Sequence, residues 1–158
     1  MISALGGIVL LMCAFSYGIE RSRVEREYLL LTEALADFVM YIGQQIETFR
    51  TPLYKIYEEY SNERFEKEIF FEVLRAKGFY EALLSIRDKL PRDVFSVLEK
   101  FSRAIGAGYE KGQAELCAYT VEGLKKMILE RKERYDSRMR MYRLLPLLLA
   151  LSFVILLL

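Results

Sequence analysis

The sequence predicts an all-α fold, an antiparallel bundle of about six helices whose first and last members continue into membrane segments. Apolar residues recur at steps of three and four, which is typical of helices, and no run of alternating β-branched residues indicates a strand. All charged side chains lie between Glu20 and Arg143, and 158 residues suffice for one compact domain with two anchors. We therefore expect a membrane helix at 1–19, a cytoplasmic bundle at 20–143 and a membrane helix at 144–158.

The two uncharged ends have the composition of membrane helices. At a rise of ~1.5 Å per residue, 1–19 spans about 28 Å and 144–158 about 22 Å, against a hydrocarbon core of ~30 Å. The first segment lacks the positive n-region and the small-residue cleavage site of a secretory signal peptide. The second would need protein on every side if it were a core helix, and a domain of this size does not supply that. Both segments are predicted to insert, the second only just spanning the bilayer.

Arginines flank both predicted membrane segments on the side of the bundle. They are Arg21, Arg23 and Arg26 after the first segment, and Arg138, Arg140 and Arg143 before the second. Because positively charged flanks stay in the cytoplasm, this arrangement predicts a cytoplasmic bundle with both termini outside.

The first predicted helix continues from the membrane segment and ends at Pro52, whose ring forbids a helical hydrogen bond. Its apolar seam alternates steps of four and three and is broken only at Gln45: Val24, Tyr28, Leu31, Leu35, Phe38, Ile42 and Phe49. We expect Thr51 to cap the second helix, with Pro52 at its first position. The second helix stops near Ser61, and its inner side carries Leu53, Ile56, Tyr57 and Tyr60.

Three further helices are expected before the last one. The third runs from about 64 to 77 and stops at Gly78, and its predicted buried row is Phe65, Ile69, Val73 and Ala76. The fourth covers 79–88. The fifth starts after Pro91 and ends at the two glycines of IGAG, and its inner face is Val94, Leu98, Phe101 and Ile105.

The last helix is predicted to start near Tyr109 and to continue into the second membrane segment. Its inner face drifts slowly around the helix: Leu116, Thr120, Leu124, Ile128, Tyr135, Met139 and Tyr142. Arg131 interrupts that face. The run LKKMILERKER supplies exposed charges on the other side.

The composition argues against catalytic, metal-binding and nucleic-acid-binding functions. The chain has no histidine, the commonest general base and transition-metal ligand. Its net charge is +1 with both signs interleaved, so no basic stripe faces a nucleic acid. The carboxylates of Glu58 and Glu59 belong to a charged helix face, and Cys13 and Cys117 are expected to be buried, reduced thiols. No catalytic residue, cofactor, metal or small-molecule substrate is predicted.

Three short stretches occur in a specific order and spacing. The first is QIETFRTPL, the second is LEKFSRAIG with a glutamine seven residues on, and the third is RMYRLL before the apolar tail. Together they resemble stage III sporulation protein AB of endospore-forming bacteria, over nearly the whole chain. The residues of this sequence that match the family motifs at its turns are Thr51, Pro52, Leu53, Phe101, Gly106 and Gln113.

The chain departs from the family pattern at three places. The family usually has Gly at the position of Phe49, Asp at the position of Tyr109, and Leu-Gly where this chain has Leu144 and Leu145. These departures are those of a diverged member.

The resemblance implies a cytoplasmic helical bundle similar to the domain of the type II secretion system F platform proteins, which are not enzymes. Members of the sporulation family are parts of a secretion-like channel in the mother-cell membrane facing the forespore. They are thought to work beside a secretion-type ATPase. The implied partners are therefore that ATPase, the other channel subunits and the lipid bilayer.

Two functional hypotheses follow. In the first, the chain is a non-enzymatic platform subunit, and Arg131, Arg134 and Arg138 contact the ATPase or form a lipid-facing collar. Alternatively, these arginines only obey the positive-inside rule. In the second hypothesis, the chain is an unrelated two-anchor membrane scaffold or sensor that oligomerises through its first long helix, along the seam from Val24 to Phe49.

Overall fold

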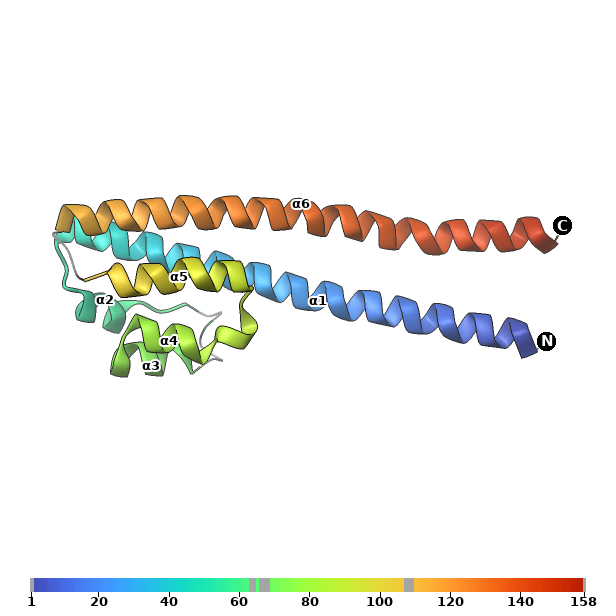
Figure 1. Ribbon diagram of the computed structural model, residues 1–158, viewed down its shortest axis with the longest axis horizontal. Helices are drawn as coiled ribbons and strands as arrows, with labels where there is room; N and C mark the ends of the chain where they lie inside the picture. The colour runs from blue at the N-terminus through green and yellow to red at the C-terminus, as the bar shows by residue number, and fades with distance from the viewer. Residues whose placement is uncertain (1, 63–64, 66–68, 107–109, 158) are drawn as a thin grey trace. The chain divides into compact units, whose positions relative to one another are not determined.

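The computed structural model describes residues 2–62, 65, 69–106 and 110–157 (Figure 1). Some of these are described by their backbone alone: residues 2–15, 17–19, 21–22, 110–111 and 138–157. The described residues form six α-helices and no strand: α1 (Ile2–Gln44), α2 (Leu53–Glu59), α3 (Phe70–Lys77), α4 (Phe79–Ser85), α5 (Arg92–Ala104) and α6 (Glu110–Leu157). A π-helical turn, Gln45–Phe49, follows α1, and a 3-10 turn, Arg87–Lys89, follows α4. The predicted all-α fold with about six helices is confirmed for this part of the chain.

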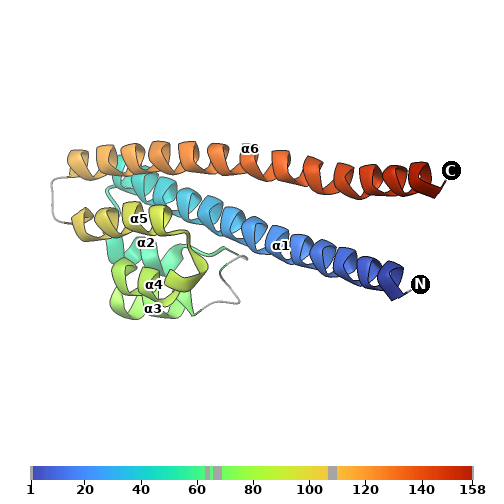
Figure 2. The same ribbon diagram turned by 45° about the vertical axis from the view of Figure 1, so that its right-hand side comes forward.

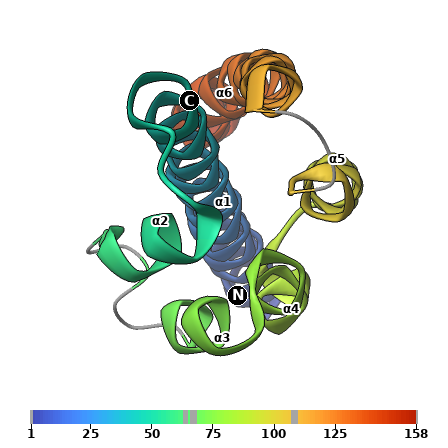
Figure 3. The same ribbon diagram turned by 90° about the vertical axis from the view of Figure 1, so that its left-hand side faces the viewer.

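Residues 28–129 form one compact unit, which we call the bundle, and 1–27 together with 130–158 form a second unit. The bundle is built around its part of α1. Figure 3, a view along that helix, shows α2, α3, α4, α5 and α6 following one another around it. Within the bundle α1 and α6 run antiparallel, and the short helices cover the remaining sides of α1.

The middle of the α1 seam is the centre of the bundle core. Leu35, Phe38 and Ile42 have no exposed surface, as their steps of three and four predict. Because one chain already encloses these side chains, they are not available for contact with a second copy. The oligomerisation in the scaffold hypothesis could therefore not use this middle part of the seam.

Phe38 joins several elements through ring contacts. Its ring centroid lies 4.6–6.2 Å from those of four aromatic side chains: Tyr57, Tyr60, Phe70 and Phe79. Tilted and edge-to-face ring pairs stabilise a core beyond the area they bury. Since these rings come from α2 and its end, α3 and α4, the cluster fastens the short helices to α1.

Glycine and proline set the boundaries of the short helices. Gly78 has a φ of 89°, a conformation that favours glycine, and it connects α3 directly to α4 (Figure 2). Pro91 is extended and immediately precedes α5. On α5 the residues Val94, Leu98 and Phe101 are buried. The predicted stop at Gly78, the restart after Pro91 and these three positions of the inner face are confirmed, whereas Ile105 follows the helix and is half-buried.

For the third helix, the prediction of which side is buried is wrong. The helix begins at Phe70, and its buried residues are Phe70, Phe71 and Leu74. Ile69 is 66% exposed, and the predicted start near residue 64 lies outside the described residues. Phe65 is buried as predicted, but it lies in a turn in which its N–H donates to the carbonyl of Asn62. The Phe65 and Phe70 rings stack with centroids 4.6 Å apart, and Phe70 is buried where the sequence predicted Ile69 to be.

Three other details differ from prediction. Phe49 is 68% exposed, because the helix widens into the π-helical turn and rotates this residue away from the seam. Pro52 occupies the capping position of α2 with an extended backbone, so Thr51 does not cap the helix and Pro52 is not its first residue. The predicted fourth helix, 79–88, ends as an α-helix at Ser85 and continues as the 3-10 turn.

The bundle's part of α6 packs with its predicted face inward. Thr120 and Leu124 are buried, Leu116 and Ile128 are half-buried, and the Thr120 hydroxyl donates to the Leu116 carbonyl at 2.8 Å. That internal hydrogen bond satisfies the one polar group on this face. The other half of α6 belongs to the second unit.

The second unit holds the predicted membrane segments. Its backbone is helical, so α1 and α6 each run without interruption into an apolar end, as predicted. No helix among the residues whose side chains are described is long and apolar enough to cross a membrane. The predicted membrane segments at 1–19 and 144–158 lie almost wholly outside those residues, as does Cys13.

Candidate functional site

The turn after α1 is held by hydrogen bonds between Gln45 and Thr51. The Thr51 hydroxyl donates to Gln45 Oε1 at 3.3 Å, and the Thr51 N–H donates to the Gln45 carbonyl at 3.2 Å. Between them, Arg50 adopts the left-handed conformation, with a φ of 52°. The motif QIETFRTPL therefore forms a closed turn in which its first and seventh residues are joined.

A second motif meets this turn at Gly106. Gly106 has a φ of 87°, and a Cβ added there would lie 3.2 Å from Leu53 Cδ1. Phe101, one turn before the end of α5, is buried with its ring centroid 5.7 Å from that of Phe79. Gln113 is half-buried near the start of α6 and makes an interaction within the chain. The stretches that contain Leu53 and Gly106 are thus in contact, and both have structural roles there.

The three arginines predicted to bind a partner lie on α6 in the second unit. Arg131 is half-buried and makes an interaction within the chain. Arg134 is exposed, and its Nη2 lies 3.9 Å from Glu130 Oε2 one turn earlier. Such an exposed pair contributes little to stability, so Arg134 can exchange Glu130 for another anion at low cost. Arg138 lies outside the residues whose side chains are described.

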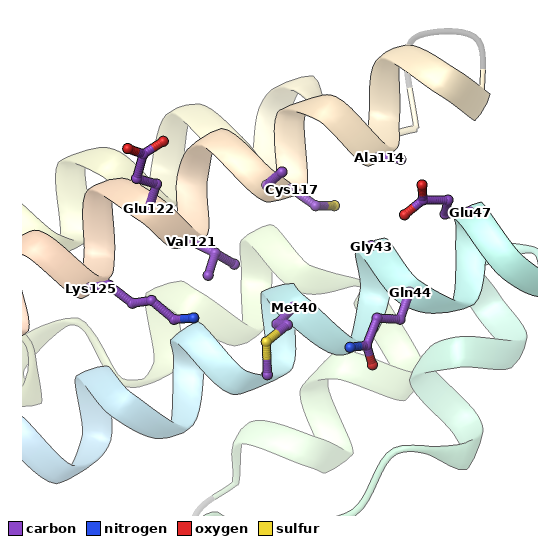
Figure 4. A pocket seen from close by; sticks show the side chains of 10 residues that line it. Met40, Gly43, Gln44, Glu47, Ala114, Cys117, Val121, Glu122 and Lys125 are labelled. Carbon is purple, nitrogen blue, oxygen red and sulfur yellow. The ribbon is translucent and has the colours of Figure 1, made fainter.

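An open groove of about 420 Å³ lies between α1 and α6 within the bundle (Figure 4). Its lining comes from the end of α1, the π-helical turn that follows it, and three turns of α6: Met40, Gly43, Gln44, Glu47, Ala114, Cys117, Ala118, Val121, Glu122 and Lys125. Small and apolar side chains form its floor, and charged ones stand at its margin. Figure 4 shows the Glu122 carboxylate directed away from α1 and the Lys125 amine directed toward the space between the helices.

Two of the residues that line the groove, Gly43 of α1 and Cys117 of α6, lie in close contact. A Cβ added to Gly43 would lie 2.9 Å from Cys117 Cβ, a distance at which something must shift. Any larger residue at this position of α1 would therefore displace part of the surrounding structure. On either side of the contact, the exposed Met40 and the exposed Ala118 leave the two helices less fully packed.

The thiol in the groove, and a phenol close to that thiol, are both protonated near neutral pH. Cys117 is buried, and burial raises the pKa of its thiol to about 11. Burial, and secondarily the nearby Cys117, raises the pKa of the Tyr57 phenol to about 12. Both groups are therefore neutral at pH 7. The expectation of a buried, reduced thiol is confirmed for Cys117.

In the part of the chain that the structure describes, the acidic side chains do not form a metal site. Among the described residues, no group of three or more Cys, Asp or Glu side chains is placed to hold a metal ion. Glu58 and Glu59 are exposed, and Glu59 Oε1 lies 3.7 Å from Lys55 Nζ on the same helix. This arrangement suits a solvated helix surface, and the groove suits the packing of another protein segment.

Sequence reasoning missed the groove. Gly43 was an available signal, since a glycine inside a helix costs stability unless a close approach requires it. The identity of the residue approached, Cys117, lies over seventy residues further along the chain and has no local signature.

The sequence was compared with known families, curated proteins and solved structures. The family model of stage III sporulation protein AB matches residues 3–158. No curated protein and no solved structure matches the chain.

Proposed function

Because the chain belongs to the stage III sporulation protein AB family and so has a role in stage III of sporulation, we propose that it is a membrane platform subunit of a secretion-like channel. The channel operates in endospore formation, between mother cell and forespore. The subunit is non-enzymatic. Its cytoplasmic bundle docks a secretion-type ATPase and neighbouring channel subunits, and its two apolar ends hold it in the mother-cell membrane.

One observation carries this proposal: every charged residue lies between two uncharged helical ends. Residues 1–19 and 144–158 contain no charged side chain, and arginines flank both on the inner side. Figure 1 shows the beginning of α1 and the end of α6 at the same end of their unit. Two such ends suit insertion into one bilayer from the same face.

The proposed ATPase contact uses the arginines on α6. Arg131, Arg134 and Arg138 follow one another at steps of three and four, so they share one side of the helix. Guanidinium groups pair well with carboxylates of a partner, and the Arg134–Glu130 pair is long and exposed enough to exchange. An acidic surface on the ATPase would meet this side of α6.

Charge reversal tests the contact. The variant carrying Arg131→Glu and Arg134→Glu should lose co-purification of the ATPase, whereas Lys100→Glu, an exposed reversal on α5, should not. Unchanged capture by the double variant would show that these arginines only obey the positive-inside rule. In that case the platform would dock the ATPase elsewhere.

Cysteine labelling tests the topology separately. A cysteine replacing Ile2 or Leu158 should react with a membrane-impermeant maleimide added outside the cell, and one replacing Glu63 should not. The unmodified chain, with Cys13 and Cys117, sets the background. If only the cysteine that replaces Glu63 were labelled, the orientation would be the opposite of the one proposed.

A further inference from the structure

One side of α6 in the bundle carries an exposed stripe at helical spacing. Ala118, Glu122, Lys125 and Leu129 follow one another at steps of four, three and four, and all four are exposed. The stripe is about 16 Å long. Leu129 is 59% exposed, although it is a large apolar residue on a helix whose opposite side is buried.

This stripe borders the groove between α1 and α6. Ala118, Glu122 and Lys125 line the groove, whose volume is about 420 Å³ (Figure 4). Ala118 leaves a shallow place there because its side chain is a single methyl group. An apolar side chain from another molecule could enter beside Ala118 and reach Met40, which is itself partly exposed on α1.

The order of residues along the stripe makes it complementary to itself. Ala118 and Glu122, a small residue and an acid, come first. Lys125 and Leu129, a base and a large apolar residue, follow, and the step of four between the first two equals the step between the last two. If two such stripes lie antiparallel about a two-fold axis between Gly123 and Leu124, each position meets the one at equal distance on the other side. The small residue Ala118 of one copy then meets the large Leu129 of the other, and the acid Glu122 meets the base Lys125.

We propose that the α6 stripe is the contact surface for a second copy of this chain. In the pair, Ala118 receives the partner's Leu129, and Glu122 faces the partner's Lys125. The two-fold axis repeats each contact, giving two central ion pairs flanked by two apolar insertions. The groove beside Ala118 is filled by the partner's Leu129.

Charge complementarity favours a second copy over an unrelated protein. An unrelated partner would need to supply a base opposite Glu122 and an acid opposite Lys125, whereas the stripe supplies both at the required spacing. The contact spans only about three helical turns, so the dimer belongs to the small, weak class of interfaces. The surface does not include Arg131, Arg134 or Arg138, so the pairing is independent of the proposed ATPase contact.

Single charge reversals test the pairing. In sedimentation of the full chain in a non-ionic detergent, Glu122→Lys and Lys125→Glu should each raise the dissociation constant about tenfold, because each places like charges together twice. Mixing the two singly reversed chains should restore association, since each then presents the charge that the other lacks. The same chain carrying both reversals should also associate.

Leu129→Ala should weaken association through its apolar contact. The matched control is Tyr119→Ala, which removes a side chain that is 78% exposed on α6 but lies outside the stripe. Circular dichroism of each variant separates loss of pairing from loss of fold. The proposal is overturned if the unaltered chain stays monomeric, if the mixed reversed chains do not associate, or if Tyr119→Ala dissociates the dimer as Leu129→Ala does.

Discussion

Gly43 of α1 and Cys117 of α6 touch so closely that a Cβ added at Gly43 would lie 2.9 Å from Cys117 Cβ. The obstructing atom is bonded directly to the backbone of a long helix, so it cannot move aside as the end of a flexible side chain can. This contact sets the spacing of the two helices and the floor of the groove beside it.

Gly43→Ala should therefore destabilise the bundle. We expect a loss of about 1–3 kcal/mol in the free energy of unfolding, the usual cost of overpacking a core. The matched control is Gly123→Ala on α6, where an added Cβ has no neighbour within 4 Å. That variant should gain about 0.8 kcal/mol from helix propensity. Equal thermal midpoints for the two variants would contradict the close approach.

Phe38→Ala should be among the most damaging single changes. Phe38 is fully buried and contacts four other rings, so its removal leaves a cavity costing about 3–5 kcal/mol. Phe49→Ala, eleven residues later, removes the same side chain from a position that is 68% exposed. It should change stability by less than about 0.5 kcal/mol. Chemical denaturation of the two variants measures the difference.

Gly106→Ala should cost about 1–2 kcal/mol, because its φ of 87° places any Cβ in a strained conformation. The added Cβ would also lie 3.2 Å from Leu53 Cδ1. Gly112→Ala on α6 is the control, since nothing lies within 4 Å of its added Cβ. If both variants melt at the same temperature, Gly106 does not need its left-handed conformation.

Stability should fall at alkaline pH. Burial raises the pKa of the Cys117 thiol from its ordinary 9.0 to about 11, so the native state retains a proton that the unfolded chain releases. The native state then binds more protons than the unfolded state, and the free energy of unfolding decreases as pH rises from 9 to 11. The decrease is at most roughly 1.4 kcal/mol per pH unit.

Cys117→Ala tests the source of that decrease. It keeps the Cβ that contacts Gly43 but removes the titrating thiol, so its stability should depend less on pH in this range. Tyr57, whose pKa is raised from 10.0 to about 12, should account for a remaining decrease from pH 10 to 12. Denaturant unfolding at a series of pH values measures both slopes. Identical slopes for the variant and the unaltered chain would remove Cys117 as the cause.

Much of the fold followed from local features of the sequence. The stop at Gly78 and the restart after Pro91 depend on the backbone geometry of single residues, which does not require knowledge of the rest of the chain. The inner face of α5 and the middle of the α1 seam follow from the helical repeat. The family resemblance, carried by short motifs in order, was confirmed over residues 3–158.

Other features depended on residues that are distant in sequence. Ile69 had the correct helical spacing to be buried, but the structure buries Phe70 and Phe71 in its place. Phe49 does not lie in the seam, because the last turn of the helix is a wider π-helical turn. Local periodicity could not decide either outcome, because each is the result of competition among several apolar side chains for one core.

The sequence by itself determined that this chain is a helical protein with uncharged ends, where most helices stop, and which face of α1 is the core. These properties follow from backbone restrictions and from the helical period, both of which act within a few residues. Only the tertiary structure decided that Gly43 meets Cys117, that a groove lies beside them, and that the stripe ending at Leu129 remains exposed. Those facts depend on how two helices more than sixty residues apart in sequence pack together, and close packing is set by the shapes of both surfaces at once.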